Sequence, residues 1–155
     1  MYLINYDEYN ITEDAVRFRV IANSNSVLDI AMKEKVVNKL SKLLFKDYKS
    51  EEELNKNIYD NLDNISKEID ILFKNNNYDM NYNILYGINE FPKKDFMGKH
   101  YDAGNYKSLV IEIGEAKGNN YFCILYPSLC VIDYENNSDN SKFSLKIVDI
   151  FNELF

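Results

Sequence analysis

The stretch that decides the fold is AVRFRVIANSNSVLDIAMKEKVVNKLSKLLF, residues 15–45. At its start, small and apolar side chains alternate with Arg17 and Arg19. This period of two predicts a strand with one buried face, and both arginine side chains are expected on its exposed side. The polar run NSNS, residues 23–26, ends the strand, and the spacing of apolar residues then changes to three or four. A strand followed directly by a helix is therefore expected.

Two amphipathic helices are expected after this strand. Ser26 is a residue type that caps helices, and apolar residues recur every three or four positions through 27–45. A second helix, over 50–75, is predicted by the capping box of Ser50 and Glu53 and by a long apolar stripe at helical spacing. Because the link between the two helices is short, we expect them to pack as an antiparallel pair.

The rest of the chain favours strands. Alternating or continuous apolar residues predict strands at 78–86, 93–97, 106–113 and 121–126. The last of these is expected in the centre of the sheet, paired with 106–113 as an antiparallel hairpin through GEAKGN, residues 114–119. Apolar residues between 143 and 154 indicate a short C-terminal helix.

These elements predict an α+β fold. Two antiparallel helices, 27–45 and 50–75, should pack on a mostly antiparallel or mixed sheet of about four to six strands, with a short C-terminal helix. Residues 15–155 are expected to form one domain. The lead-in over 1–14 is compatible with the removal of an export segment that preceded it.

The composition argues against several classes of partner and cofactor. The formal net charge is −7, so most of the surface should repel a phosphate backbone or anionic lipid headgroups. Neither nucleic acid nor a membrane surface is therefore expected as a partner. The five glycines match neither a dinucleotide fingerprint nor a P-loop, and we expect no cofactor. The oligomeric state is left open.

No catalytic residue or metal ligand is predicted. His100 is the only histidine, and it lies in the polar segment MGKHYDAG without a nucleophile motif around it. A surface histidine is the favoured interpretation. Cys123 and Cys130 do not have the spacing of a zinc site. They are interpreted as two buried thiols, as a disulfide around Pro127, or as a catalytic thiol assisted by His100, and the residues alone leave all three open.

The two arginines and the polar run that follows them are a candidate recognition surface. Two guanidinium groups on a rigid strand could each bind a carboxylate of a partner. Salt bridges to the acidic helices within the chain are the competing interpretation. The candidate partner-binding residues are Arg17, Arg19, Asn23, Ser24, Asn25 and Ser26.

Two segments resemble the stage II sporulation protein R family of endospore-forming bacteria. They are VRFRVIANSNSVLDIAMKEKV, residues 16–36, and FPKKDFMGKHYDAGNYKSLVIEIGEAKGNNYFCILYPSLCVID, residues 91–133. KFSLKIVDIFNE is also similar to the closing segment of the family. The positions that match the family motifs are Arg17, Asn23, Ser24, Gly104, Tyr106, Gly114, Glu115, Gly118, Cys123, Pro127 and Cys130. Asn25 replaces an expected acidic residue, and Tyr121 with Phe122 replaces paired tryptophans.

The resemblance implies an exported signalling protein rather than an enzyme. Such a protein leaves the forespore, enters the space between forespore and mother cell, and activates a membrane-bound aspartic protease that cleaves pro-sigma-E. This compartment favours a disulfide between Cys123 and Cys130. Two alternatives stay open: a cell-wall or thiol hydrolase that uses Cys123 and His100, and an inhibitor or scaffold of another extracytoplasmic protein.

Overall fold

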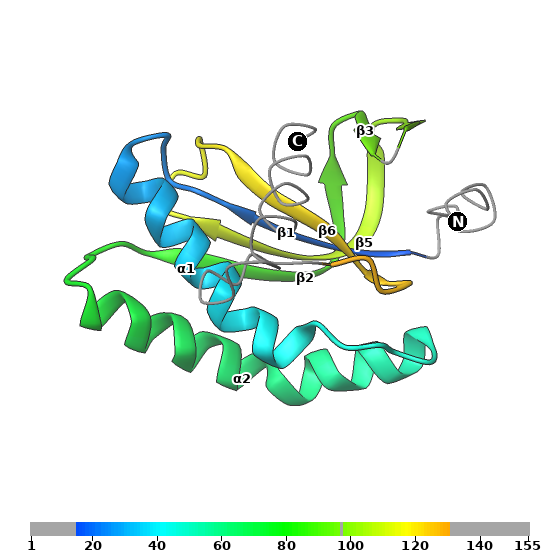
Figure 1. The fold of residues 1–155 in the computed structure, drawn as a ribbon, viewed down its shortest axis with the longest axis horizontal. Coiled ribbons are helices and arrows are strands. Elements are labelled where there is room, and N and C mark those ends of the chain that lie inside the picture. Colours follow the sequence, from blue (N-terminus) through cyan, green and yellow to red (C-terminus); the bar gives the residue numbers. More distant parts are fainter. Residues whose placement is uncertain (1–14, 97, 131–155) are drawn as a thin grey trace, which may run out of the picture.

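Two helices cover one face of a four-stranded sheet, and a separate two-stranded sheet stands at one end of the long strands (Figure 1). The computed structural model describes residues 15–96 and 98–130. In chain order the elements are β1 (Val16–Ile21), α1 (Val27–Leu44), α2 (Glu51–Asn75), β2 (Tyr82–Phe91), β3 (Lys94–Phe96), β4 (Lys99–Tyr101), β5 (Gly104–Ile113) and β6 (Asn120–Tyr126). The predicted α+β class is confirmed. The lead-in over 1–14 and the expected C-terminal helix lie outside the described residues.

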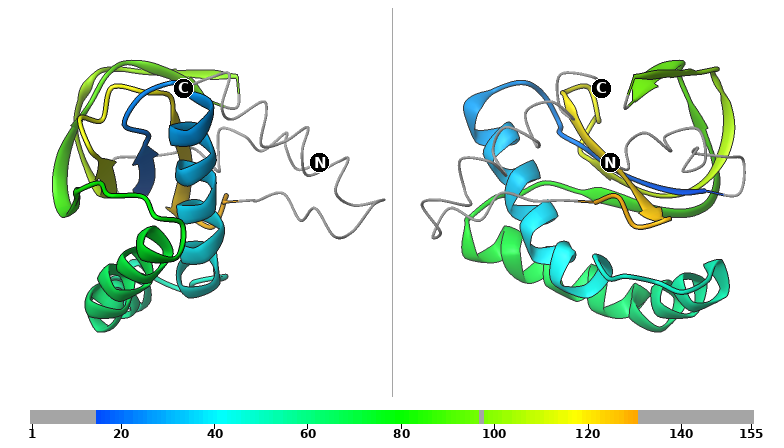
Figure 2. Two further views of the ribbon diagram at one scale, coloured as in Figure 1. Left: turned by 90° about the vertical axis from the view of Figure 1, so that its left-hand side faces the viewer. Right: turned by 45° about the vertical axis from the view of Figure 1, so that its right-hand side comes forward.

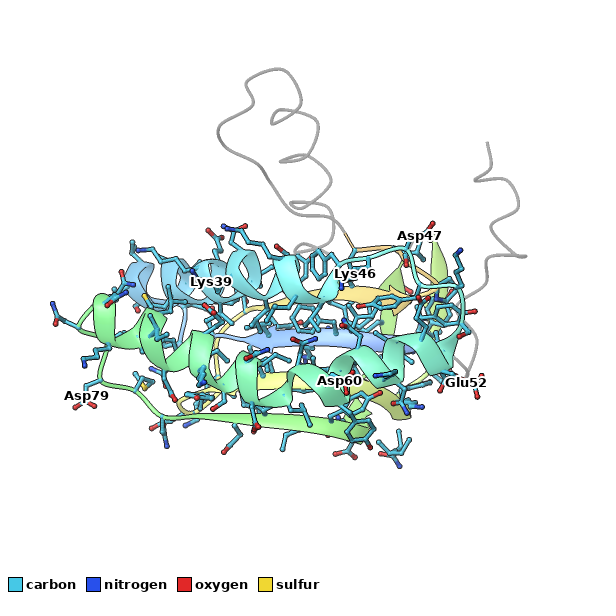
Figure 3. All side chains as sticks on the ribbon, turned by 90° about the horizontal axis from the view of Figure 1, so that it is seen from below. Lys39, Lys46, Asp47, Glu52, Asp60 and Asp79 are labelled. Atoms are coloured by element: carbon cyan, nitrogen blue, oxygen red, sulfur yellow. A yellow bond between two sulfur atoms is a disulfide. The ribbon has the colours of Figure 1, made fainter. Side chains whose placement is uncertain are left out.

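Both predicted helices form within one residue of their expected ends. Ser26 Oγ accepts a hydrogen bond from the Asp29 backbone N–H at 3.1 Å, which caps α1. Ser50 Oγ accepts one from the Glu53 N–H at 3.1 Å, which caps α2. The helices run beside each other in opposite directions, as expected (Figure 1). Charged side chains such as Asp60 lie on the outer side of the pair (Figure 3).

The strand order in the large sheet is β2-β5-β1-β6. β1 is parallel to β5 and antiparallel to β6, so it lies between them. The predicted hairpin of 106–113 with 121–126 is therefore wrong, and within the described sheet β6 is an edge strand rather than a central one. Residues 114–119 are long enough to cross the end of β1, because neighbouring strands are only about 4.8 Å apart. A local turn signal cannot reveal that a distant strand is inserted.

The sheet has an apolar cluster on each face. On the helix side, Val16, Phe18 and Val20 are fully buried against the two helices, with Phe18 and Phe45 in edge-to-face contact at 5.9 Å. On the other side, the cluster contains Ala15, Ile21, Phe91, Val110, Phe122 and Ile124. The prediction that β1 has one exposed face is therefore wrong, because side chains cover both of its faces.

The long β2–β5 ribbon explains how the second face becomes covered. The first part of β2 packs Tyr82, Ile84 and Tyr86 against the helix-side cluster. Beyond Gly87, which has φ of +149°, Phe91 joins the cluster on the opposite face. The ribbon curves strongly as it leaves the helices (Figure 2). β2 therefore contributes to both clusters, and the small β3–β4 sheet extends from the end that contributes to the second one.

Candidate functional site

The polar run at the end of β1 is tied to α1 through a buried carboxylate. Asn23 Nδ2 and Ser24 Oγ donate hydrogen bonds to Asp29 Oδ2 at 2.8 and 2.6 Å. The Tyr78 hydroxyl donates to Asp29 Oδ1. The hydrogen bonds from Ser24 and Tyr78 hold the pKa of Asp29 below its ordinary value. Burial and the contact with Asp29 raise the pKa of Tyr78.

The same run binds the turn over 114–119. The Asn23 side-chain oxygen accepts a hydrogen bond from the Glu115 N–H at 2.8 Å, and the Asn25 side-chain oxygen accepts one from the Asn119 N–H at 2.6 Å. Main-chain bonds add to these contacts, including Gly118 N–H to the Ala22 carbonyl at 2.8 Å and Lys117 N–H to the Asn23 carbonyl at 3.1 Å. The two turns therefore form one hydrogen-bonded unit, which we call the paired turns (residues 22–26 and 114–119).

Two glycines allow this close approach. A Cβ at Gly118 would lie 2.3 Å from the Ser24 carbonyl oxygen, and a Cβ at Gly114 would lie 2.3 Å from the Asn23 side-chain oxygen. Gly114 also has φ of +59°, which favours glycine. Asn23, Ser24, Gly114 and Gly118 thus hold the paired turns together.

An apolar surface remains exposed beside the paired turns. Val27 is 89% and Leu28 is 59% exposed at the start of α1. Asn25 and Ser26, directly before them, are also exposed. Of the candidate partner-binding residues, Asn25 and Ser26 are therefore the two that offer a free surface, although each also makes a hydrogen bond within the chain.

The arginines do not lie on an exposed face. Arg17 is only 3% exposed. Its guanidinium carbon lies 3.6 Å from the ring centre of Tyr106, 5.0 Å from that of Phe91 and 5.8 Å from that of Phe122. Arg19 is half-buried, with its guanidinium carbon 5.4 Å from the Phe91 ring centre. The expected exposure of both side chains is wrong because β2, β5 and β6 bring aromatic rings over this face.

Salt bridges from the arginines to the helices are not formed either. The helices cover the opposite face of the sheet, so the guanidinium groups project away from them. Among residues 15–96 and 98–130, no ion pair within 4 Å includes Arg17 or Arg19. Burial lowers the pKa of both guanidinium groups.

Lys94 on β3 completes a cluster of cations with the two arginines. Burial and the charges of Arg19 and Arg17 lower the pKa of Lys94 to about 8. Sequence reasoning missed the roles of Lys94, Phe91 and Tyr106 here, because these residues come from the far end of the β2–β5 ribbon. We call Arg17, Arg19 and Lys94 the cation cluster.

Cys123 and Cys130 form a disulfide with a Cα–Cα distance of 5.0 Å. It links β6 to the loop that follows Pro127, whose peptide bond with Tyr126 is cis. Ser128 in this loop donates a hydrogen bond to the Lys46 carbonyl at 2.7 Å, so the loop also contacts the connection between the helices. Of the three interpretations of Cys123 and Cys130 made from the sequence, the structure agrees with the disulfide.

A family model described as stage II sporulation protein R matches residues 12–136, which is most of the chain. The chain belongs to the stage II sporulation protein R family. It is 30% identical over 129 residues to stage II sporulation protein R of Bacillus subtilis (strain 168), covering 81% of this chain and 58% of that relative. The chain therefore spans little more than half the length of this curated relative. No solved structure matches it.

The positions that were predicted from the sequence to match family motifs fall in three places in the fold. Asn23, Ser24, Gly114, Glu115 and Gly118 build the paired turns. Arg17 and Tyr106 stack on each other, and Gly104 starts the strand that carries Tyr106. Cys123, Pro127 and Cys130 form the disulfide loop.

His100 lies on β4, exposed, in the small sheet. Its Nδ1 is 2.9 Å from Asp95 Oδ1, and its Nε2 is 3.7 Å from Asp102 Oδ1. Cys123 is fully buried and bonded to Cys130, so it is not the free thiol that a Cys123–His100 mechanism requires. In the described part of the chain there is no group of three or more potential metal-ligating side chains, and no helix is long and apolar enough to span a membrane.

Proposed function

We propose that this chain is the signalling domain of an exported sporulation protein. It activates a membrane-bound aspartic protease of the mother cell and thereby starts cleavage of pro-sigma-E. Membership of the stage II sporulation protein R family is the observation that carries this proposal. The family match includes the whole described fold, from β1 to β6.

The disulfide supports a location outside the cytoplasm. Structural disulfides persist in oxidising compartments, whereas cytosolic reductants keep most thiols reduced. Cys123 is fully buried at its end of the bond. With the family membership, this supports our proposal that the domain acts in the space between forespore and mother cell.

The domain acts by contact and makes or breaks no bond of a substrate. In the described residues both cysteines are in the disulfide, and the His100 ring nitrogens lie beside the carboxylates of Asp95 and Asp102 rather than beside a nucleophile. The paired turns support a contact role, because they hold a surface in one conformation through many hydrogen bonds. Because this surface is already ordered, it loses little conformational entropy when a partner binds.

We propose the exposed end of α1 as part of the contact surface. Asn25 and Ser26 offer polar groups there, and Val27 and Leu28 offer apolar area that the fold leaves in water. Apolar patches framed by polar residues are typical of protein interfaces. The aspartic protease receptor is the partner to which this surface is assigned.

Complementation of sporulating cells tests the proposal. Cells that lack their own stage II sporulation protein R would express this chain behind an export signal, and cleavage of pro-sigma-E would be followed by immunoblot. Cleavage is expected with the exported chain and not with a matched chain that lacks the signal. Absence of cleavage from an exported, folded chain would contradict the proposal, and cleavage without export would contradict the location.

A variant pair tests the contact surface in the same cells. Val27→Asp with Leu28→Asp places charges on the exposed apolar patch, whereas Ile71→Asp changes an apolar side chain that is 50% exposed on α2. The double variant should abolish cleavage of pro-sigma-E, and Ile71→Asp should leave it intact. Equal cleavage with both would remove the end of α1 from the contact surface.

A further inference from the structure

The cation cluster concentrates positive charge in an acidic protein. The chain has a net charge of −7, and Arg17 and Arg19 are its only arginines. Both lie on one face of β1, and Lys94 lies near enough for their charges to depress its pKa. Like charges that gather in a half-buried site destabilise one another, which favours a function for the cluster beyond folding.

The arginine side chains have hydrogen-bonding capacity that the described residues do not use. The Nε atoms of Arg17 and Arg19 are both buried and have no hydrogen-bond partner there. The rings of Phe91, Tyr106 and Phe122 attract the Arg17 guanidinium through their π-faces, but the N–H group still lacks an acceptor. A buried donor without an acceptor costs about 1 to 3 kcal/mol, and more when it is charged.

Glu112 on β5 does not satisfy this need. Its charge partly offsets the effect of burial, which lowers the pKa of Arg19, but it forms no ion pair within 4 Å with that residue among the described pairs. Instead its Oε1 lies 3.4 Å from Asn83 Nδ2, which donates to it. Arg17 and Arg19 therefore keep donor groups that an external acceptor can complement.

We propose that the cation cluster binds an extended acidic segment of a partner protein, in which two carboxylates are two positions apart. This deepens the proposed function and rests on it for the nature of the partner. Arg17 and Arg19 are two positions apart on one strand, which separates their Cα atoms by about 6.6 Å. An extended Glu-x-Glu segment has the same repeat, so each carboxylate can pair with one guanidinium group.

The aromatic side chains limit the direction from which a ligand approaches. The Phe91 ring lies close to both guanidinium groups and is itself buried, so a carboxylate reaches them from the side away from this ring. Arg19 is half-buried, so a carboxylate from solvent reaches it first. Tyr106 covers Arg17 and is held by a hydrogen bond from its hydroxyl to the Asp102 carbonyl at 2.7 Å. The proposed complex requires the Tyr106 ring to move, so that the second carboxylate reaches the buried Arg17.

The presence of only two arginines makes a direct test possible. A ¹⁵N-labelled sample gives two arginine Nε–H signals, one for Arg17 and one for Arg19, assigned with Arg17→Lys and Arg19→Lys. Three blocked peptides would be titrated: acetyl-Ala-Glu-Ala-Glu-Ala-amide, the same peptide with Gln for both Glu, and acetyl-Ala-Glu-Glu-Ala-Ala-amide. The last has the same charge but directs its carboxylates to opposite sides of an extended chain.

Both Nε–H signals should shift and saturate with the Glu-Ala-Glu peptide. Its Kd should be at least tenfold lower than that of the Gln peptide, equivalent to about 1.4 kcal/mol, and lower than that of the Glu-Glu peptide. Replacing Arg19 by methionine should remove this preference, whereas Lys117→Met, which removes an exposed charge elsewhere, should leave it unchanged.

Three results would overturn the inference. The two Nε–H signals could keep their chemical shifts during the titration, either because no peptide binds or because carboxylates of the chain itself already bind the guanidinium groups. The Glu and Gln peptides could bind equally, or the two Glu spacings could bind equally. Since no protease takes part in this titration, its failure is distinct from failure of the proposed function, which the cleavage of pro-sigma-E reports.

Discussion

Replacing Gly118 by alanine should separate the paired turns. The new Cβ would begin 2.3 Å from the Ser24 carbonyl oxygen, and an ordinary contact starts at 3.4 Å. The turn over 114–119 must therefore move by about 1 Å, since the obstructing atom belongs to the backbone and cannot rotate away. The hydrogen bond from Gly118 N–H to the Ala22 carbonyl, now 2.8 Å, would lengthen beyond hydrogen-bonding distance.

The loss of stability follows from these contacts. The bond of Lys117 N–H to the Asn23 carbonyl, at 3.1 Å, and that of Asn119 N–H to the Asn25 side chain would weaken with the same movement. Two or three hydrogen bonds at about 1 kcal/mol each give a loss of about 2 to 3 kcal/mol. The reduced entropy of the unfolded alanine variant offsets about 0.4 to 1 kcal/mol of this. We expect a net loss of about 2 kcal/mol.

Gly104→Ala is the matched control. Gly104 does not have a positive φ, and a Cβ there would meet the Tyr106 side chain at 3.5 Å, an ordinary contact. Urea unfolding followed by circular dichroism should show a midpoint lower by about 1 M for Gly118→Ala, and an unchanged or slightly higher midpoint for Gly104→Ala. Equal midpoints for the two variants would refute the structural role assigned to the paired turns.

Three further changes have expected outcomes. Arg17→Met should leave the free energy of unfolding unchanged or raise it, because it removes a buried charge that lacks a carboxylate partner in the described structure; a loss above 2 kcal/mol in urea unfolding would show that Arg17 serves folding instead. Replacing both Cys123 and Cys130 by serine opens a loop with a sequence separation of 7 and should lower the free energy of unfolding by about 2 to 3 kcal/mol. Thiol titration of the unreplaced protein, denatured without reductant, should find no free thiol at either position. Lys94 has a pKa of about 8 in the folded chain and about 10.4 when unfolded, so the unfolded chain binds the extra proton between these values. Relative to Lys94→Met, the free energy of unfolding should therefore rise from pH 8 toward pH 10 by up to about 1.4 kcal/mol per pH unit. If the free energies of unfolding of the two proteins change with pH in parallel, the lowered pKa of Lys94 is contradicted.

The helices could be predicted from the sequence because their signals are local. Ser26 with Asp29, and Ser50 with Glu53, lie within one helical turn of each other, and the observed caps use these residues. The apolar stripes also lie within single elements. Nothing distant in the chain was needed to place these two elements.

The environment of β1 could not be predicted because it depends on distant residues. Alternation of Arg17 and Arg19 with apolar residues is typical of an edge or half-exposed strand. The rings that cover Arg17 come from Phe91, Tyr106 and Phe122, which the β2–β5 ribbon and β6 bring to it. The insertion of β1 between β5 and β6 is likewise invisible in a local turn signal.

The role of the polar run after β1 could not be predicted from the sequence either. A sequence such as NSNS at a strand end fits a recognition surface as well as a structural turn. Asn23 and Asn25 in fact accept hydrogen bonds from Glu115 and Asn119, which are more than 90 positions away. The sequence alone did not show that Asn23, Gly114 and Gly118 join two turns, which became clear only from the fold.

Reconstitution with purified components tests the central claim, that this domain signals by contact. The folded domain would be added to the membrane-bound aspartic protease in vesicles, with pro-sigma-E as substrate and cleavage followed over time. The account predicts that cleavage depends on the domain, saturates as its concentration rises, and persists with His100→Ala. Cleavage that is unaffected by the folded domain, or that is lost with His100→Ala while the variant stays folded, would contradict the account.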